Sequence, residues 1–186
     1  MKSELRYGII GAGSMGREHI ENIKVMGGAT VTAISDPHVP SQEAALAMAP
    51  GAKVFTDHRA LLESGLVDAV VIATPNDTHA AVLKDALESD LAVFVEKPLA
   101  TTIEDLKSIL AWDEKRSAMT WMGLEYRFMP PVAEAIARAK EGKRERFIKF
   151  QSGNIANRFT QRLITGIDLQ SVPVEPLSKN VATTLT

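Results

Sequence analysis

The sequence of 186 residues contains no cysteine, few aromatic residues (5%) and no apolar run long enough to cross a bilayer. Without cysteine the chain cannot form a disulfide framework. Its amino terminus, MKSELRYG, lacks the apolar segment of a signal peptide. The formal net charge of -2 creates no basic field that would attract nucleic acid. We therefore expect a cytoplasmic protein whose partners include neither nucleic acid nor a membrane.

Apolar residues make up 45% of the chain, enough for one well-buried domain plus a fragment. Short apolar runs alternate with helical stretches, which is typical of a parallel sheet with helices on both faces. Strands are predicted at residues 5–10, 30–35, 53–55, 67–73, 91–95, 118–122 and 147–151. Helices are predicted at residues 14–26, 41–48, 57–62, 77–88, 101–116 and 130–140. Asp57 is the expected cap of the third helix, and the capping-box spacing from Thr101 to Glu104 is expected to open the fifth. The predicted fold class is α/β, with a doubly wound parallel sheet.

A glycine-rich turn separates the first predicted strand from the first predicted helix. Gly11, Gly13 and Gly16 have the GxGxxG spacing of dinucleotide-binding turns. The first glycine permits a tight turn, the second lets backbone approach a pyrophosphate, and the third lets the helix pack close to the strand. The amino end of the helix then presents free N–H groups to the phosphates. The candidate cofactor-binding residues here are Gly11, Ala12, Gly13, Ser14, Met15 and Gly16.

An acidic residue, Asp36, ends the second predicted strand, about twenty residues beyond Gly16. A carboxylate at this place can accept both ribose hydroxyls of an adenosine. The two predicted strands, the helix between them and Asp36 together favour a dinucleotide site over a purely structural glycine turn. An unrelated α/β methyltransferase that uses the turn for another nucleotide is the less favoured alternative.

Two further loops are expected beside this turn, because ligands bind outside the carboxyl ends of parallel strands. One carries Thr74, Pro75, Asn76 and His79, and the other carries Glu96, Lys97 and Pro98. Beside a cationic nicotinamide the charged form of the Lys97 amine is disfavoured, which suits it to take a hydroxyl proton as hydride leaves carbon. Lys97 is thus the candidate catalytic residue. The alternative is a surface lysine paired with Glu96.

The remaining polar candidates give weaker signals. His79 lies in the first turn of a predicted helix, where a structural role is expected. Arg127 follows the sixth predicted strand on the same edge and either reaches cofactor or substrate or forms a salt bridge. No metal site is predicted, because three other histidines lack acidic or cysteine partners at ligand spacing: His19, His38 and His58.

In order along the chain, GAGSMG, Asp36, ATPNDTH, VEKP and EYRFMPP resemble the amino-terminal half of the Gfo/Idh/MocA family over about residues 4–150. The resemblance implies an NAD(P)-binding Rossmann domain with Lys97 at the nicotinamide and favours a cis bond at Pro98. Asp36 implies NAD as cofactor without excluding NADP. A second α/β domain that binds sugars or cyclitols and mediates homo-oligomers follows in the family.

Family members oxidise or reduce a secondary alcohol, and the acid and histidine that assist the lysine come from the second domain. The resemblance therefore implies an oxidoreductase acting on a polyol or sugar. For this chain we expect cofactor binding with little or no turnover. The alternative is a non-enzymatic dinucleotide-binding module or sensor.

The domain division predicted on this basis is a cofactor domain at residues 1–125, a remnant of the second domain at 126–152 and a non-native or disordered tail at 153–186. The tail is rich in Thr, Ser, Asn and Pro and shows no helical or alternating period. Shifted by two bases, allowed codons for residues 171–186 can read GTGGTLVEKCCHYFD, which resembles the family's second domain. We expect a frameshift between about Gln151 and Asn157 that truncates the protein; the nucleotide sequence tests it.

Overall fold

Six parallel strands form the centre of the part of the chain that the computed structural model describes, residues 4–140. A few side chains from Tyr126 onward, that of Arg127 included, are outside this description. The strand expected at 147–151 and the tail at 153–186, for which a frameshift is predicted, also lie outside the described residues. The chain divides into two units, Met1–Ala137 and Arg138–Thr186, and the first unit holds the whole sheet. The domain boundaries predicted at residues 125 and 152 stay predictions.

The strand order of the sheet is β3-β2-β1-β4-β5-β6, and every neighbouring pair is parallel. This is the doubly wound order, in which the chain changes direction across the sheet between β1 and β4. The strands are β1 (Leu5–Ile10), β2 (Ala29–Ser35), β3 (Lys53–Phe55), β4 (Ala69–Ile72), β5 (Ala92–Val95) and β6 (Thr120–Met122). The α/β prediction is confirmed.

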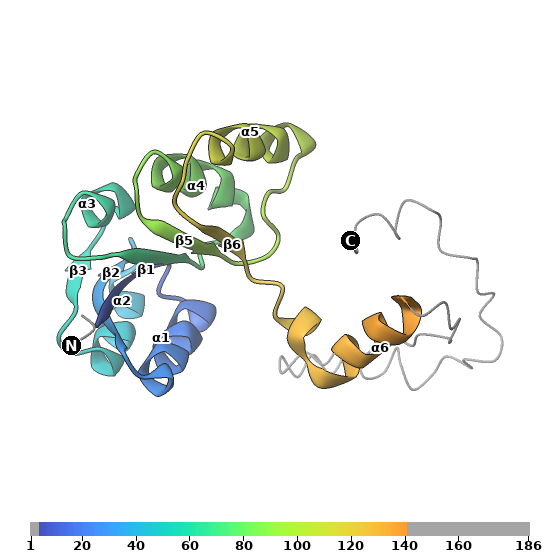
Figure 1. Cartoon of the computed structure of the whole chain (residues 1–186). Coiled ribbons are helices and arrows are strands. Elements are labelled where there is room, and N and C mark those ends of the chain that lie inside the picture. Colours follow the sequence, from blue (N-terminus) through green and yellow to red (C-terminus); the bar gives the residue numbers. More distant parts are fainter. Residues whose placement is uncertain (1–3, 141–186) are drawn as a thin grey trace, which may run out of the picture. The chain divides into compact units, whose positions relative to one another are not determined.

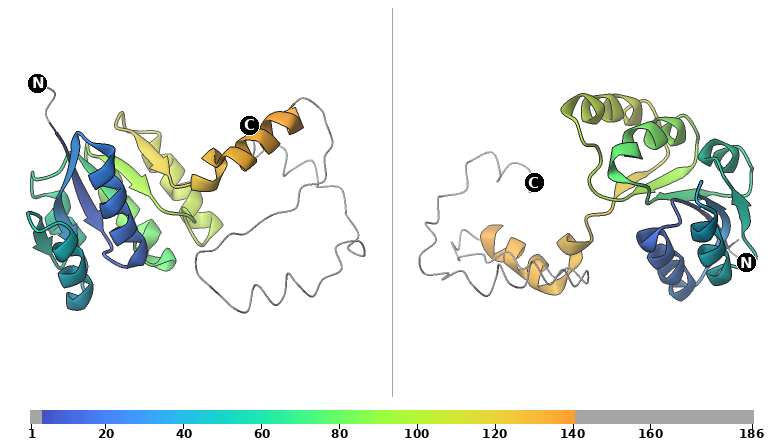
Figure 2. Two further views of the ribbon diagram at one scale, coloured as in Figure 1. Left: turned by 90° about the horizontal axis from the view of Figure 1, so that it is seen from below. Right: turned by 180° about the vertical axis from the view of Figure 1, so that it is seen from behind.

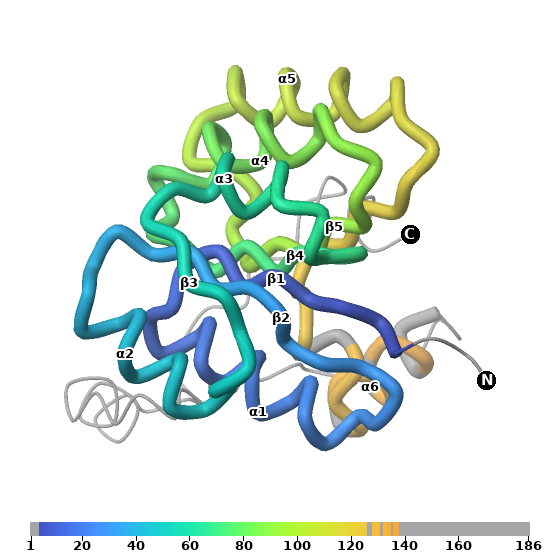
Figure 3. The backbone as a smooth tube through the Cα atoms, turned by 90° about the vertical axis from the view of Figure 1, so that its left-hand side faces the viewer, coloured from blue at the N-terminus to red at the C-terminus, as the bar shows by residue number. Residues whose placement is uncertain are grey.

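Helices cover both faces of this sheet, as Figures 1 and 3 show. One face carries α1 (Ser14–Met26) and α2 (Val39–Met48), and the other carries α3 (His58–Leu62), α4 (His79–Leu87) and α5 (Ile103–Asp113). The view from behind in Figure 2 shows the same two layers. The remaining elements are η1 (Asn76–Thr78), η2 (Glu125–Phe128) and α6 (Pro130–Lys140). Of the helices in residues 4–140, none combines the length and apolar character needed to span a bilayer.

The core consists of two apolar layers separated by the sheet. Ile9 and Ile10 of β1 are almost fully buried, and because successive side chains of a strand point to opposite faces, they join different layers. Ile9 packs in the layer that contains Ile20 of α1, and Ile10 packs in the layer that contains Leu83 of α4. Burial on both faces explains why the central strands are continuous apolar runs.

Several helix starts differ from the prediction by one or two residues, among them those of α2 and α5. Helix α2 begins at Val39, two residues before the predicted start, with Pro40 in its first turn, where its missing N–H costs nothing. Helix α5 is capped by Thr102 and not by Thr101. The Thr102 hydroxyl oxygen accepts the Asp105 backbone N–H at 3.1 Å, so the capping box lies one residue later than expected. The predicted cap Asp57 of α3 is confirmed.

Candidate functional site

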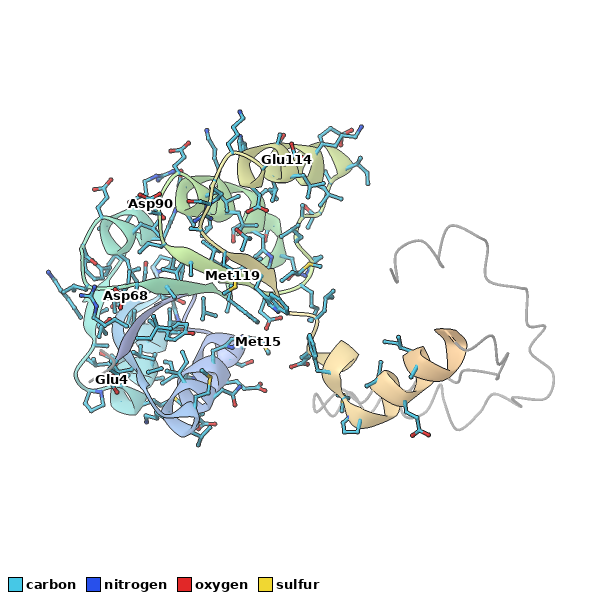
Figure 4. All side chains as sticks on the ribbon, in the orientation of Figure 1. Glu4, Met15, Asp68, Asp90, Glu114 and Met119 are labelled. Atoms are coloured by element: carbon cyan, nitrogen blue, oxygen red, sulfur yellow. The ribbon has the colours of Figure 1, made fainter. Side chains whose placement is uncertain are left out.

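The glycine turn after β1 lies at the carboxyl ends of the strands, where Figure 4 labels Met15 at the start of α1. Gly11 has a φ of 93°, and a Cβ there would lie 2.6 Å from the carbonyl oxygen of Ala73. At Gly16 a Cβ would lie 1.9 Å from the carbonyl oxygen of Gly11. These glycines therefore let α1 and the β4 loop close onto the turn.

Gly13 has a different role from its two neighbours. Its φ of -65° suits any residue, and an added Cβ would meet no atom within 4 Å. The fold thus does not need glycine here, and the space beside Gly13 is open. As the N-cap of α1, Gly13 brings no side chain to the first N–H groups, and the first turn holds no acidic residue. The helix end is left free for an anion such as a diphosphate.

Asp36, at the end of β2, is tied to the glycine turn. Its Oδ2 accepts the Ala12 backbone N–H at 2.7 Å, and its Oδ1 accepts the His38 backbone N–H at 2.8 Å. Each carboxylate oxygen has about two acceptor sites, so each can still accept a hydroxyl. The carboxylate is therefore held in place with capacity for the ribose hydroxyls of an adenosine.

The loop after β4 supplies a buried polar atom without a partner. Among the described residues, the hydroxyl oxygen of Thr74 is buried and has no hydrogen-bond partner. Pro75 and Asn76, which follow it, are exposed. A buried hydroxyl without a partner is costly, so a ligand that bonds it here would be favoured. The Thr74 hydroxyl and the open space at Gly13 both fit a bound dinucleotide.

His79 joins the β4 loop to the loop after β5. The side chain is fully buried, with Nε2 2.9 Å from the carbonyl oxygen of Thr74 and Nδ1 2.7 Å from that of Pro98. A neutral imidazole has one N–H and donates to one of these carbonyls, and the protonated ring donates to both. His79 contacts the backbone of both loops and acts as a structural bridge between them.

The Glu96-Lys97-Pro98 turn follows β5, and the Lys97–Pro98 peptide bond is cis. Lys97 is exposed, whereas Glu96 is buried. Glu96 forms its salt bridge with His19, whose Nε2 lies 2.9 Å from Oε1. Burial alone would raise the pKa of Glu96, but the hydrogen bond and charge of His19, with Lys97, hold this pKa below its ordinary value. Among residues 4–140 the ion pair of Glu96 is with His19, and the charge of Lys97 also acts on Glu96, so the role of Lys97 stays a prediction.

The structure brings the loops after β1, β2, β4 and β5 to one edge of the sheet, as parallel topology requires. Of the predicted site residues, Arg127 lies in η2, and its side chain is outside the described part. Among the described residues no group of three or more His, Cys, Asp or Glu side chains is placed to hold a metal ion.

Sequence reasoning missed two residues of α1. Arg17 donates from its guanidinium to the Ala12 carbonyl at 2.9 Å, which places a positive charge against the glycine turn. His19 contacts Glu96. The spacing held a signal for His19, because it lies three residues after Gly16 and therefore on the same face of the helix, toward the sheet.

The family model described as "Oxidoreductase family, NAD-binding Rossmann fold" matches residues 5–124. The chain belongs to the Gfo/Idh/MocA family. This Gfo/Idh/MocA match covers the whole sheet and every predicted site residue except Arg127. The fold class and the cofactor predicted from the sequence, a Rossmann sheet that binds NAD, are confirmed.

Curated Gfo/Idh/MocA relatives include dehydrogenases of inositol. The chain is 37% identical over 145 residues to inositol 2-dehydrogenase 2 of Paenarthrobacter aurescens, covering 75% of this chain and 43% of that protein. It is 40% identical over 116 residues to inositol 2-dehydrogenase of Corynebacterium glutamicum, covering 62% of this chain and 34% of that protein. The chain thus spans less than half the length of these relatives.

Solved structures agree with this family assignment. The myo-inositol dehydrogenase of Lactobacillus casei, in complex with NAD(H) and myo-inositol, aligns with a TM-score of 0.70 and 33% identity over 75% of this chain and 42% of that one. The WlbA dehydrogenase of Bordetella pertussis, in complex with NADH and UDP-GlcNAcA, aligns with a TM-score of 0.72 and 26% identity. The alignment covers 76% of this chain and 42% of that one.

Proposed function

We propose that these residues form the cofactor half of an NAD-dependent oxidoreductase that oxidises a secondary alcohol of a cyclitol or related polyol. The observation that carries the proposal is that four features meet at the carboxyl ends of the strands. They are the open space at Gly13, the hydrogen-bonded Asp36 carboxylate, the Thr74 hydroxyl that has no partner among the described residues, and the exposed Lys97. The polyol substrate rests on the inositol dehydrogenases among the relatives.

In this proposal the residues divide between the two ends of the dinucleotide. Gly11 to Gly16 and the amino end of α1 hold the diphosphate, and Asp36 accepts the adenosine ribose hydroxyls. Thr74 bonds its otherwise unpartnered hydroxyl to the cofactor. NAD, when bound, supplies a hydride acceptor for the alcohol carbon.

Lys97 acts on the hydroxyl proton. The amine is exposed at the end of β5, whereas its main chain is fixed by Glu96. It accepts the proton from the alcohol as the carbonyl forms, and it returns that proton in the reverse direction. The charge of a neighbouring cationic ring favours the neutral amine that this step requires.

A second candidate function is dinucleotide binding without turnover. It is favoured by the residues at this edge of the sheet, since the glycine turn, Asp36 and the Thr74 hydroxyl are all assigned to holding the cofactor. Both functions require the NAD site, and only the first requires Lys97 to act in catalysis.

The experiment measures binding and turnover on the same preparation. NAD at a hundred times its Kd should stabilise the folded chain by about 2.7 kcal/mol, seen as a higher melting temperature. A panel of polyols, myo-inositol among them, is then tested for NADH formation. Lys97→Met should abolish turnover and keep most of the thermal shift. Turnover that survives in Lys97→Met contradicts the proposed role, and shifts without any turnover favour the second candidate.

A further inference from the structure

His19 connects the phosphate-facing helix to the lysine turn through Glu96. It lies on α1, and its Nε2 is 2.9 Å from Glu96 Oε1. Both side chains are largely buried, at 17% exposed for His19 and 9% for Glu96. The His19 ring also packs edge-on against Phe94 of β5, with ring centroids 5.1 Å apart. The imidazole therefore has a defined position against the end of β5.

The other oxygen of the Glu96 carboxylate faces the main chain of the turn. Oε2 accepts the backbone N–H of Lys97 at 3.2 Å, and the Glu96 N–H donates to the Ile72 carbonyl at 2.9 Å. A Cβ at Gly123 would lie 3.3 Å from Glu96 Oε1, so the neighbouring β6 loop leaves little room for this side chain to move. The carboxylate thus bridges α1 and the backbone of Lys97.

We propose that His19 is a positioning residue, which holds the Lys97 turn at the nicotinamide end of the site through the Glu96 carboxylate. The inference rests on the proposed function, in which α1 is fixed by the diphosphate. Helix α1, which binds the diphosphate in this proposal, then also sets the position of Lys97 at the nicotinamide end of the cofactor. Loss of the His19 donor leaves a buried carboxylate oxygen unpaired and releases one side of the turn.

The test compares two ligands that differ at one end. ADP-ribose contains the adenosine, the diphosphate and the second ribose of NAD but lacks the nicotinamide ring. Calorimetry gives the Kd of each ligand for the full chain. The ratio of the two values isolates the contribution of the nicotinamide end, where Lys97 lies in this proposal, from that of the glycine turn.

His19→Phe removes the donor and keeps a ring against Phe94. We expect it to weaken NAD binding about tenfold, the loss expected from one hydrogen bond to a charged group, and ADP-ribose binding by less than about twofold. His19→Gln, whose side-chain amide can replace the Nε2 donor, should restore most of the NAD affinity. Glu18→Gln, on the exposed face of the same helix, is the matched control and should change neither Kd.

Glu96→Gln is the second variant, and it carries the test if His19→Phe does not fold. It should lower NAD affinity selectively, and combining it with His19→Phe should add little, since both act through one contact. Equal losses for the two ligands, or no loss for either, would overturn the positioning role.

The same measurements separate this inference from the proposed function. An unsubstituted chain that binds neither ligand overturns both. If it binds ADP-ribose as tightly as NAD, the dinucleotide site stands and the positioning role of His19 is overturned. A tighter Kd for NAD that His19→Phe removes and His19→Gln restores supports the inference.

Discussion

The Asp36 carboxylate and the Ala12 backbone are joined by a hydrogen bond of 2.7 Å, which ties the end of β2 to the glycine turn after β1. The contact spans 24 residues of sequence. It orients the carboxylate from two sides, because the His38 N–H bonds the other oxygen. The negative charge is therefore held in one place, where the proposed function puts the adenosine ribose.

Replacing Asp36 should change the choice of cofactor. A carboxylate accepts ribose hydroxyls and repels a 2′-phosphate, so NAD is expected to bind more tightly than NADP. Asp36→Ser should weaken NAD binding by about tenfold or more, as expected for hydrogen bonds to a charged group, and should affect NADP less. Calorimetry with both cofactors checks this. Asp90→Asn, labelled in Figure 4, lies just before β5 at the opposite edge and should alter neither affinity.

Substitution by alanine should affect NAD binding at Gly13 and the stability of the fold at Gly16. Gly13→Ala adds a methyl group to open space with permitted backbone angles, so the free energy of unfolding should change by less than about 1 kcal/mol while NAD binding falls sharply. Gly16→Ala drives a Cβ into the Gly11 carbonyl and should destabilise the fold itself. Chemical denaturation and calorimetry separate the effects. Gly51→Ala, also facing open space, is the control, and loss of stability in Gly13→Ala would contradict the assignment.

Removing the His79 bridge should lower stability. His79→Leu leaves the Thr74 and Pro98 carbonyls without their ring partner in a buried position. A neutral ring donates one N–H, and the loss of a hydrogen bond at a buried site costs roughly 1–3 kcal/mol, which urea unfolding can measure. His38→Leu, at an exposed position, should cost less than about 1 kcal/mol. A similar loss in both variants would argue against the bridge.

The Arg6–Asp68 pair should make stability depend on pH in the acidic range. The side-chain and backbone hydrogen bonds from Arg6 lower the pKa of Asp68 from 3.8 to about 2. Because the pKa is lower in the folded state, the pair stabilises the protein above the unfolded pKa and ceases to do so as pH falls through about 2. Asp68→Asn should therefore melt below the unsubstituted protein near neutral pH, and the gap should close on acidification. A gap that is constant with pH would contradict this.

Local sequence patterns predicted most of the helices and strands. They placed the cap of α5 one residue too early, where two similar signals overlap. Thr101 and Thr102 each stand three residues before an acidic residue, so two capping boxes compete. The structure has Thr102 as the cap, with its hydroxyl oxygen accepting the Asp105 backbone N–H. Asp57 had no competing neighbour, and its cap was predicted correctly. The side chain of Arg127 lies outside the described part, so its role stays a prediction.

By itself the sequence determined the alternation of strands and helices, the glycine turn and the placing of Asp36 and Lys97 at strand ends. These features depend on residues close together along the chain, through side-chain period and backbone freedom. Only the tertiary structure decided that His19 meets Glu96 across 77 residues and Arg6 meets Asp68 across 62. Such pairs depend on which strands become neighbours and in what register, and burial of the whole core sets both.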